Sequence, residues 1–194
     1  MRIIHCAPFN IITKTGGALY ANPIKISQGL IQNNHFVHNF DYRDTSRYMS
    51  FFRNKKNGQK KMNEFFRTLV DDISPELIIF GHAELILEET FEYIKKKNIR
   101  MIFWYNDIPL QNHFKSIAHY FDFILTTAGG DFISDIKKYN ENAFFLPNLV
   151  DENIEKYRAY ENKKYENDKK NQTKCCRLVS KSHHFCNYFC FAKI

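Results

Sequence analysis

Six short apolar runs, separated by longer polar segments, constrain the fold of this chain more than any other feature. They lie at residues 1–9, 35–42, 75–81, 100–105, 121–128 and 142–147. Each interval between them is long enough to hold a helix. Runs such as LIIF and MIFW are apolar throughout, which is typical of strands covered by helices on both faces. The sequence therefore predicts a Rossmann-like α/β fold, with a parallel sheet of about six strands flanked by helices.

Two of the intervening helices can be placed from the sequence. Residues 60–73 (KKMNEFFRTLVDDI) repeat their apolar side chains at helical spacing, which predicts one buried stripe. The members of this stripe are Met62, Phe65, Phe66, Leu69, Val70 and Ile73. An earlier helix is predicted to start at Asn22 and Pro23, because proline loses no hydrogen bond at a first helical position. Ile24, Gln28 and Ile31 are expected on its inner face.

Composition limits the setting in which the protein works. Four of the five cysteines fall after residue 174, which is unlike a secreted disulfide framework, so a reducing, cytoplasmic location is expected. No run approaches the ~20 apolar residues of a membrane span. More than half of the net charge of +7 lies in residues 151–194, and the basic clusters lack interleaved aromatic residues, which argues against a nucleic-acid partner. Peripheral association with the inner face of a membrane stays open.

A glycine pair follows the first predicted strand, although the chain has only seven glycines. The segment TKTGG includes Lys14, Thr15, Gly16 and Gly17, and it precedes the predicted start of a helix. Glycines there permit close approach of a ligand, and a helix N-terminus attracts anions. The sequence matches neither common phosphate-loop pattern. A flexible loop without a ligand remains the alternative interpretation.

The Lys-Thr-Gly-Gly loop resembles one in the N-terminal domain of GT-B glycosyltransferases, where it lies near the sugar-nucleotide diphosphate. Residues 144–157 (FFLPNLVDENIEKY) are similar to the segment that leads from this domain into the second one, with Leu149 in place of the usual glycine. FGHAE, FWYNDIP and DFILTTAGGD look most like bacterial CgeB-like and lipopolysaccharide-sugar transferases. The resemblance covers residues 1 to about 160 and implies the acceptor-side half of a GT-B fold.

This resemblance implies transfer of a sugar from a nucleotide sugar to a cell-surface glycan acceptor, without a cofactor or metal. In the resembling enzymes a second domain makes most contacts to the donor, and nothing after residue 160 looks like that domain. The chain alone is therefore expected to be inactive, because a departing nucleoside diphosphate needs groups from both walls of a cleft. The alternative is a non-catalytic α/β module that binds a nucleotide or another small ligand in a pocket of its own.

Several candidate site residues directly follow predicted strands, where functional groups of such sheets gather. Asp107 is placed to act as a general base on an acceptor hydroxyl, and His82 to bind the acceptor or share a proton relay. Helix capping by Asp107 and a surface position for His82 are the competing interpretations. Asn106, Gly129 and Gly130 are the further candidates for substrate binding. The letters GGDF at residues 129–132 do not indicate a cyclase, because a helix is expected to start there.

The C-terminal segment, residues 161–194, differs in character from the rest of the chain. It begins as a polar, charge-rich linker. It ends in a stretch rich in Cys, His and Phe, in which apolar residues recur at neither strand nor helix spacing. The adjacent pairs Cys175/Cys176 and His183/His184 cannot easily converge on one zinc ion. From about Lys169 onward we expect the chain to be poorly ordered or weakly packed. A shift of the reading frame in the gene would produce a sequence of this kind. A short native tail that docks on the sheet is the alternative.

Overall fold

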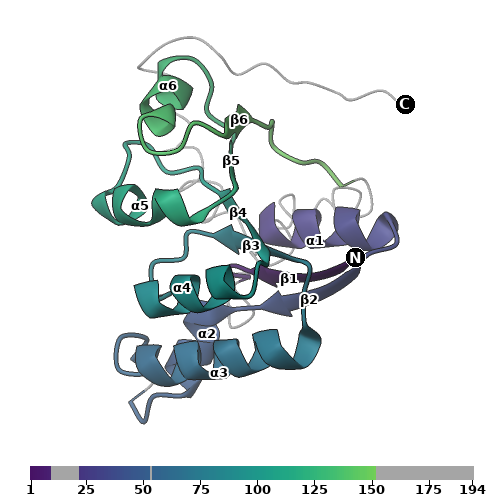
Figure 1. Ribbon diagram of the computed structural model, residues 1–194, viewed down its shortest axis with the longest axis vertical. Coiled ribbons are helices and arrows are strands. Elements are labelled where there is room, and N and C mark those ends of the chain that lie inside the picture. Colours follow the sequence, from purple (N-terminus) through teal and green to yellow (C-terminus); the bar gives the residue numbers. More distant parts are fainter. Residues whose placement is uncertain (10–21, 53, 152–194) are drawn as a thin grey trace, which may run out of the picture.

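The computed structural model describes residues 1–9, 22–52 and 54–151, and these form an α/β fold around one parallel sheet (Figure 1). The sheet has six strands in the order β2-β1-β3-β4-β5-β6. The strands are β1 (Arg2–Cys6), β2 (Phe36–Phe40), β3 (Leu77–Gly81), β4 (Arg100–Trp104), β5 (Phe123–Thr126) and β6 (Ala143–Phe145). All five pairings are parallel, so the predicted Rossmann-like architecture is confirmed.

The strand order reverses direction between β1 and β3. From β1 the chain first adds β2 on one side, then returns to add β3 on the other side and continues outward to β6. Ligands of open α/β sheets bind outside the carboxyl ends of the strands at such a switch point. The topology therefore predicts a ligand site near the residues that follow β1 and β3.

Helices lie on both faces of the sheet, as the uniformly apolar strands predict (Figure 1). They are α1 (Asn22–Gln32), α2 (Tyr42–Tyr48), α3 (Gln59–Ile73), α4 (Glu88–Lys96), α5 (Asn112–Ile117) and α6 (Asp131–Lys137), with a 3₁₀ turn η2 at Ala118–Tyr120. Helix α1 covers one face with Ile26 and Leu30. Helices α3, α4 and α5 pack on the opposite face around a larger core. None of the helices in these described ranges has the length and apolar character needed to cross a bilayer.

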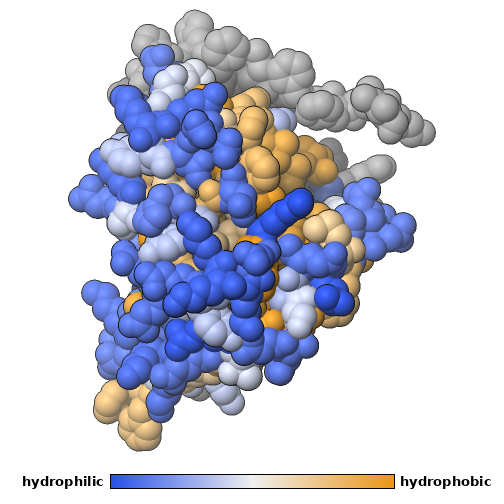
Figure 2. All heavy atoms as spheres, viewed as in Figure 1, coloured by the Kyte–Doolittle hydropathy of each residue, from blue (hydrophilic) through white to orange (hydrophobic). Residues whose placement is uncertain are grey.

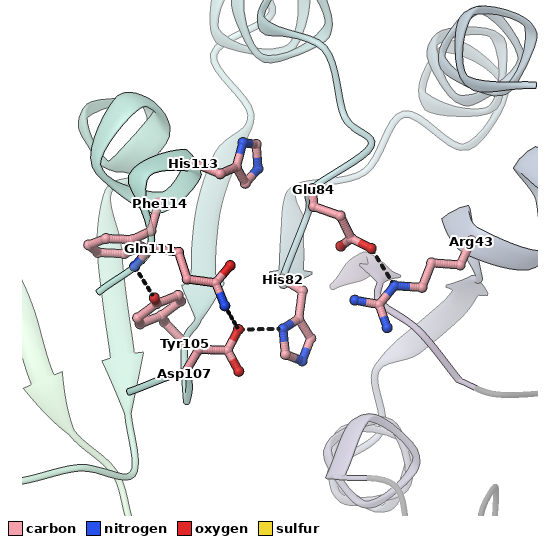
Figure 3. A pocket seen from close by; sticks show the side chains of 8 residues that line it. All are labelled: Arg43, His82, Glu84, Tyr105, Asp107, Gln111, His113 and Phe114. Carbon is pink, nitrogen blue, oxygen red and sulfur yellow. Dashed lines mark hydrogen bonds and ion pairs between the residues drawn. The ribbon is translucent and has the colours of Figure 1, made fainter. Parts of the chain in front are cut away.

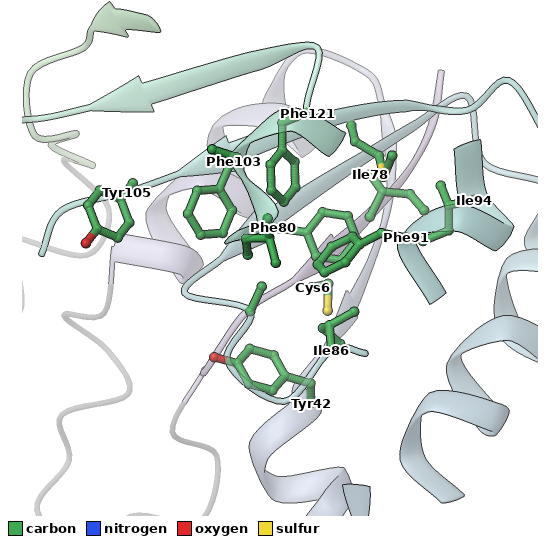
Figure 4. Packing of buried hydrophobic residues seen from close by; sticks show 14 of the residues in the cluster. Cys6, Tyr42, Ile78, Phe80, Ile86, Phe91, Ile94, Phe103, Tyr105 and Phe121 are labelled. Atoms are coloured by element: carbon green, nitrogen blue, oxygen red, sulfur yellow. The ribbon is translucent and has the colours of Figure 1, made fainter. Parts of the chain in front are cut away.

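The larger core is built from aromatic rings (Figure 4). Phe80 of β3 lies at its centre, with its ring centroid 5.3 Å from Phe91 of α4 and 5.6 Å from Phe121 after η2. Phe103 of β4 stacks on Phe121 at 4.6 Å. All four side chains are nearly or fully buried. Because these rings lie directly beneath the carboxyl ends of β3 and β4, they give the loops above them a rigid base.

The predicted stripe of α3 is mostly confirmed, with one correction. Met62, Phe66 and Val70 are buried, and Leu69 and Ile73 pack against the margin of the same core. Phe65 is 46% exposed, so its assignment to the buried stripe was wrong. Among the described residues its ring has an aromatic contact with Phe40 of β2, at 6.2 Å, and β2 is an edge strand of the described sheet.

The predicted inner face of α1 is wrong for two of its three members. Gln28 and Ile31 are exposed, Ile24 is half-buried, and the buried positions are Ile26 and Ser27. The Ser27 hydroxyl lies 2.8 Å from His5 Nδ1 and donates to Asn39 Oδ1 at 2.7 Å. Burial lowers the pKa of His5 to about 3, so its ring is neutral and Ser27 can pair with it. A polar contact therefore sets the rotation of this helix, which apolar periodicity could not reveal.

Gly58 is predicted to be essential for the approach of α3 to α2. A Cβ atom at this position would lie 1.8 Å from the carbonyl oxygen of Ser46, although the φ angle of Gly58, −89°, suits any residue. Replacement by alanine should lower the free energy of unfolding, measured in urea, by about 1–3 kcal/mol. Gly29→Ala is the matched control, because nothing lies within 4 Å of the added carbon and the helix gains propensity. Equal effects of the two substitutions would contradict this close approach.

Candidate functional site

A cavity of about 240 Å³ lies at the carboxyl ends of β3 and β4, beside the switch point of the sheet (Figure 3). Its walls combine ionisable and aromatic side chains from helix α2, the loop after β3, and the loop after β4 with the start of α5. The lining residues are Arg43, His82, Glu84, Tyr105, Asp107, Gln111, His113 and Phe114. The cavity is slightly smaller than typical ligand pockets, which measure about 300–1,000 Å³.

An unusual turn carries His82 into this cavity. His82 and Ala83 both have positive φ angles, 62° and 57°, directly after β3. The Ala83 N–H donates to the Gly81 carbonyl at 2.8 Å, an i→i+2 bond around His82 that is typical of the strained classic γ-turn. Consecutive left-handed residues other than glycine are costly and cluster at functional sites. The turn therefore marks this loop as a candidate site on backbone geometry alone.

His82 and Asp107 form a hydrogen-bonded pair across the cavity. His82 Nδ1 lies 3.1 Å from Asp107 Oδ2, and the Gln111 amide donates to the same oxygen at 3.3 Å. The hydrogen bond from His82 lowers the pKa of Asp107, against the opposing effect of burial, so the carboxyl group is ionised at neutral pH. An ionised carboxylate can only accept, so Nδ1 carries the proton. In the neutral tautomer with its proton on Nδ1, the lone pair lies on Nε2.

The turn after β4 holds Asp107 in place. The backbone N–H of Gln111 donates to Tyr105 Oη at 3.0 Å, and the Tyr105 ring stacks on Phe114 of α5 at 4.2 Å. The N-cap residue of α5 is Gln111, and the described hydrogen bonds of Asp107 go to side chains and not to the helix backbone. The geometry therefore does not favour the helix-capping interpretation of Asp107.

A second carboxylate, Glu84, faces the cavity from the side of α2. Tyr42 Oη and Arg43 Nε both donate to Glu84, the latter at 2.5 Å, and Lys55 Nζ lies 3.6 Å away. Burial would raise the pKa of Glu84, but the hydrogen bonds from Arg43 and Tyr42 outweigh it and lower the pKa to about 2. Burial also raises the pKa of Tyr42, with the Glu84 charge adding to the effect. Glu84 is thus ionised at neutral pH, and its hydrogen bond with Nε orients the Arg43 side chain.

Arg43 has donors left over after this pairing. Only its Nε is engaged with Glu84 among the described hydrogen bonds. Figure 3 shows its guanidinium group next to Glu84 and on the same side of the cavity as His82. A guanidinium group has five N–H donors in a planar fork. Arg43 can therefore donate to an oxygen of a ligand bound next to His82.

The structure brings together some of the predicted site residues and separates others. His82 and Asp107 share the cavity, as their positions after β3 and β4 suggested. Asn106 points elsewhere and accepts from Thr127 Oγ1 at 3.4 Å. Gly129 and Gly130 follow the neighbouring strand β5 but do not line the cavity. The predicted loop Lys14, Thr15, Gly16 and Gly17 lies outside the described residues, as does the segment 161–194.

Arg43 and Glu84 were not singled out from the sequence, although the same positional rule could have found them. Arg43 follows β2 in FDYRD, and Glu84 follows β3 in GHAE, two residues after His82. Tyr105, Gln111, His113 and Phe114 also went unnoticed, because an aromatic or amide residue near a strand end carries no distinctive signal. His113 Nε2 donates to the Ala83 carbonyl at 3.1 Å and so supports the strained turn from above.

Within the described ranges no three His, Cys, Asp or Glu side chains are arranged to hold a metal ion. Comparison with models of known protein families gave no match, and comparison with curated proteins gave no significant similarity. The site is therefore interpreted from its own geometry: a histidine, an ionised carboxylate hydrogen-bonded to it, and an arginine side chain in one small cavity.

Proposed function

We propose that this cavity is the acceptor-binding and proton-accepting half of a sugar transferase. The observation that carries the proposal is the His82–Asp107 pair, which leaves a lone pair on His82 Nε2 inside a cavity at the switch point. The resemblance of the chain to GT-B glycosyltransferases supplies the reaction class.

The chemistry follows from the pair. An acceptor hydroxyl that hydrogen-bonds to His82 Nε2 gives up its proton as its oxygen attacks the anomeric carbon of the donor sugar. The bond from that carbon to the nucleoside diphosphate breaks, and the diphosphate leaves with the electron pair. Asp107 keeps the ring in the correct tautomer and stabilises the imidazolium that forms. In this arrangement His82 is the base and Asp107 positions it, the reverse of the order favoured by the sequence.

The size and walls of the cavity support a sugar as the ligand. A cavity of about 240 Å³ fits one sugar ring better than a whole nucleotide sugar. Gln111 and Arg43 supply donors for the hydroxyl groups of a sugar, while the buried Tyr105 and Phe114 rings close the floor of the cavity. We propose that the groups that bind the nucleotide come from the other wall of the cleft, as in the resembling enzymes.

One observation favours a different class of function. The free donors of Arg43 lie in the same cavity as His82, which suits an anionic small ligand bound without any reaction. The alternative is therefore an α/β module that binds a nucleotide or another small anion.

Ligand-detected saturation-transfer NMR on the full chain separates the two functions. The panel contains hexoses and disaccharides on one side, and UMP, UDP, GDP and CMP on the other. The transferase proposal predicts weak saccharide binding that falls at least about tenfold in His82→Ala, because one hydrogen bond to the ligand is lost. His119→Ala is the control, since His119 lies outside the cavity, on the 3₁₀ turn η2. Tight nucleotide binding without saccharide binding would favour the small-ligand module and reject the transferase.

A further inference from the structure

The loop between α2 and α3 carries an exposed aromatic group. Tyr48, Phe51 and Phe52 are 87%, 94% and 78% exposed, the highest values among the large hydrophobic residues that the structure describes. The rings of Phe51 and Phe52 touch edge to face, 5.1 Å apart. An apolar tip projects at the lower left in Figure 2, where Figure 1 places the α2–α3 loop. A soluble surface that projects adjacent aromatic rings in this way indicates an interaction site.

Hydrogen bonds hold the aromatic loop in one conformation. The Ser46 hydroxyl donates to the Lys55 carbonyl at 2.5 Å, and the Ser50 hydroxyl accepts from the Asn54 N–H at 3.3 Å. The Asn54 side chain accepts from the Lys56 N–H at 2.9 Å, and Gly58 packs closely on Ser46. Polar groups thus tie the loop to the end of α2 while its aromatic rings point outward. These hydrogen bonds therefore fix the loop in the conformation that exposes Phe51 and Phe52 to solvent.

The surroundings of the aromatic loop are basic. The sequence from Thr45 to Asn63 contains six Lys and Arg residues and no Asp or Glu. Lys56, Lys60 and Lys61 are exposed, and no acidic side chain of the described part of the chain forms an ion pair with them. The two other described cations of this stretch, Arg47 and Lys55, face Asp44 and Glu84. Three exposed lysines without a described ion pair thus follow the aromatic residues closely in the sequence.

We propose that this surface, Tyr48, Phe51 and Phe52 with Lys56, Lys60 and Lys61, docks the protein on an anionic lipid bilayer. Aromatic side chains prefer the boundary between headgroups and acyl chains, and lysines are attracted to anionic headgroups just above it. A projecting tip suits a soft surface that it can enter. Single-stranded nucleic acid instead favours aromatic residues interleaved with basic ones, whereas here Phe51 and Phe52 precede the three lysines as a separate group.

Sedimentation of the full chain with vesicles tests this surface. Vesicles of phosphatidylcholine alone are compared with vesicles that also contain phosphatidylglycerol, at low and high salt. We expect binding only to the anionic vesicles, reversed by salt because surface charges are screened. The double variant Phe51→Ser with Phe52→Ser, and the triple variant Lys56→Glu, Lys60→Glu and Lys61→Glu, should each reduce vesicle partition at least about tenfold.

Two control variants carry equivalent changes elsewhere on the surface. Phe36→Ser with Val150→Ser removes exposed apolar groups on β2 and after β6. Lys96→Glu, Lys115→Glu and Lys137→Glu reverse three exposed charges on α4, α5 and α6. Both controls should keep anionic-vesicle binding within about threefold of wild type. The proposal is overturned if wild type does not bind anionic vesicles, or if the loop variants bind as well as the controls. It is also overturned if Phe51 and Phe52 affect only self-association in size-exclusion chromatography.

Discussion

Replacement of Glu84 by alanine is expected to lower the free energy of unfolding at neutral pH by about 3 kcal/mol, because it leaves a buried tyrosine hydroxyl and an arginine without their partner. Tyr42 is fully buried, and both Tyr42 and Arg43 donate to Glu84. Urea unfolding of both proteins measures the difference. Glu89→Ala, which removes an acidic residue from the first turn of α4, is the comparison and should cost less than about 1 kcal/mol.

The Glu84 contribution should also depend on pH in a defined direction. The folded state lowers the pKa of Glu84 from 4.5 to about 2. A lowered pKa means that the folded state favours the ionised form, so this stability is fully present above pH 4.5 and is lost as the pH falls toward 2. We therefore expect the difference in unfolding free energy between wild type and Glu84→Gln to shrink over that interval. A difference that stays constant down to pH 2 would show that Glu84 contributes packing only.

The second large effect is expected at Asn63, a fully buried residue of α3. Its amide donates to the Gln59 and Leu85 carbonyls, each at 2.8 Å. Its carbonyl oxygen accepts from the Leu87 N–H at 3.0 Å and from the Thr90 hydroxyl at 2.9 Å. All of its hydrogen-bonding capacity thus clamps the segment after Glu84 onto α3. Asn63 therefore supports the cavity without lining it.

Replacing Asn63 by leucine should lower the free energy of unfolding by about 3 kcal/mol, since the size is nearly unchanged while buried donors and acceptors lose their partner. The matched control is Asn33→Leu. Asn33 also donates to a helix carbonyl, that of Gly29 at 2.7 Å, but it is exposed, so a change below about 1 kcal/mol is expected. If the two variants lose similar stability, the clamp does not contribute as described.

The fold could be predicted from the sequence because its apolar runs are long, uniform and regularly spaced. Strands such as 77–81 and 100–104 are covered on both faces, so burial marks almost every residue in them. Helix positions were less predictable where polar side chains face inward. Ser27 turns α1 toward His5, and Asn63 lies in the buried stripe of α3, and neither contributes to an apolar period.

The candidate site was predictable in position but not in detail. His82 and Asp107 could be singled out because parallel strands place their carboxyl ends at one edge of the sheet. Their contact depends on the left-handed turn at His82 and Ala83, which packing around Gly81 helps to set: a Cβ there would lie 3.1 Å from Ala7. Such long-range contacts leave no local pattern. The same holds for the pairing of Arg43 with Glu84, 41 residues apart.

The tautomer of His82 is the most direct test of the proposed base. Long-range ¹H–¹⁵N correlation spectra of the histidine-labelled full chain report which ring nitrogen carries the proton, and His82→Gln assigns the signals. For the neutral ring, the geometry predicts the proton on Nδ1 and the lone pair on Nε2. The Nε2 signal should shift when a saccharide is added, and the tautomer preference should be lost in Asp107→Ala. A proton on Nε2, or a ring that does not respond to any saccharide that binds, would contradict His82 as the proton acceptor.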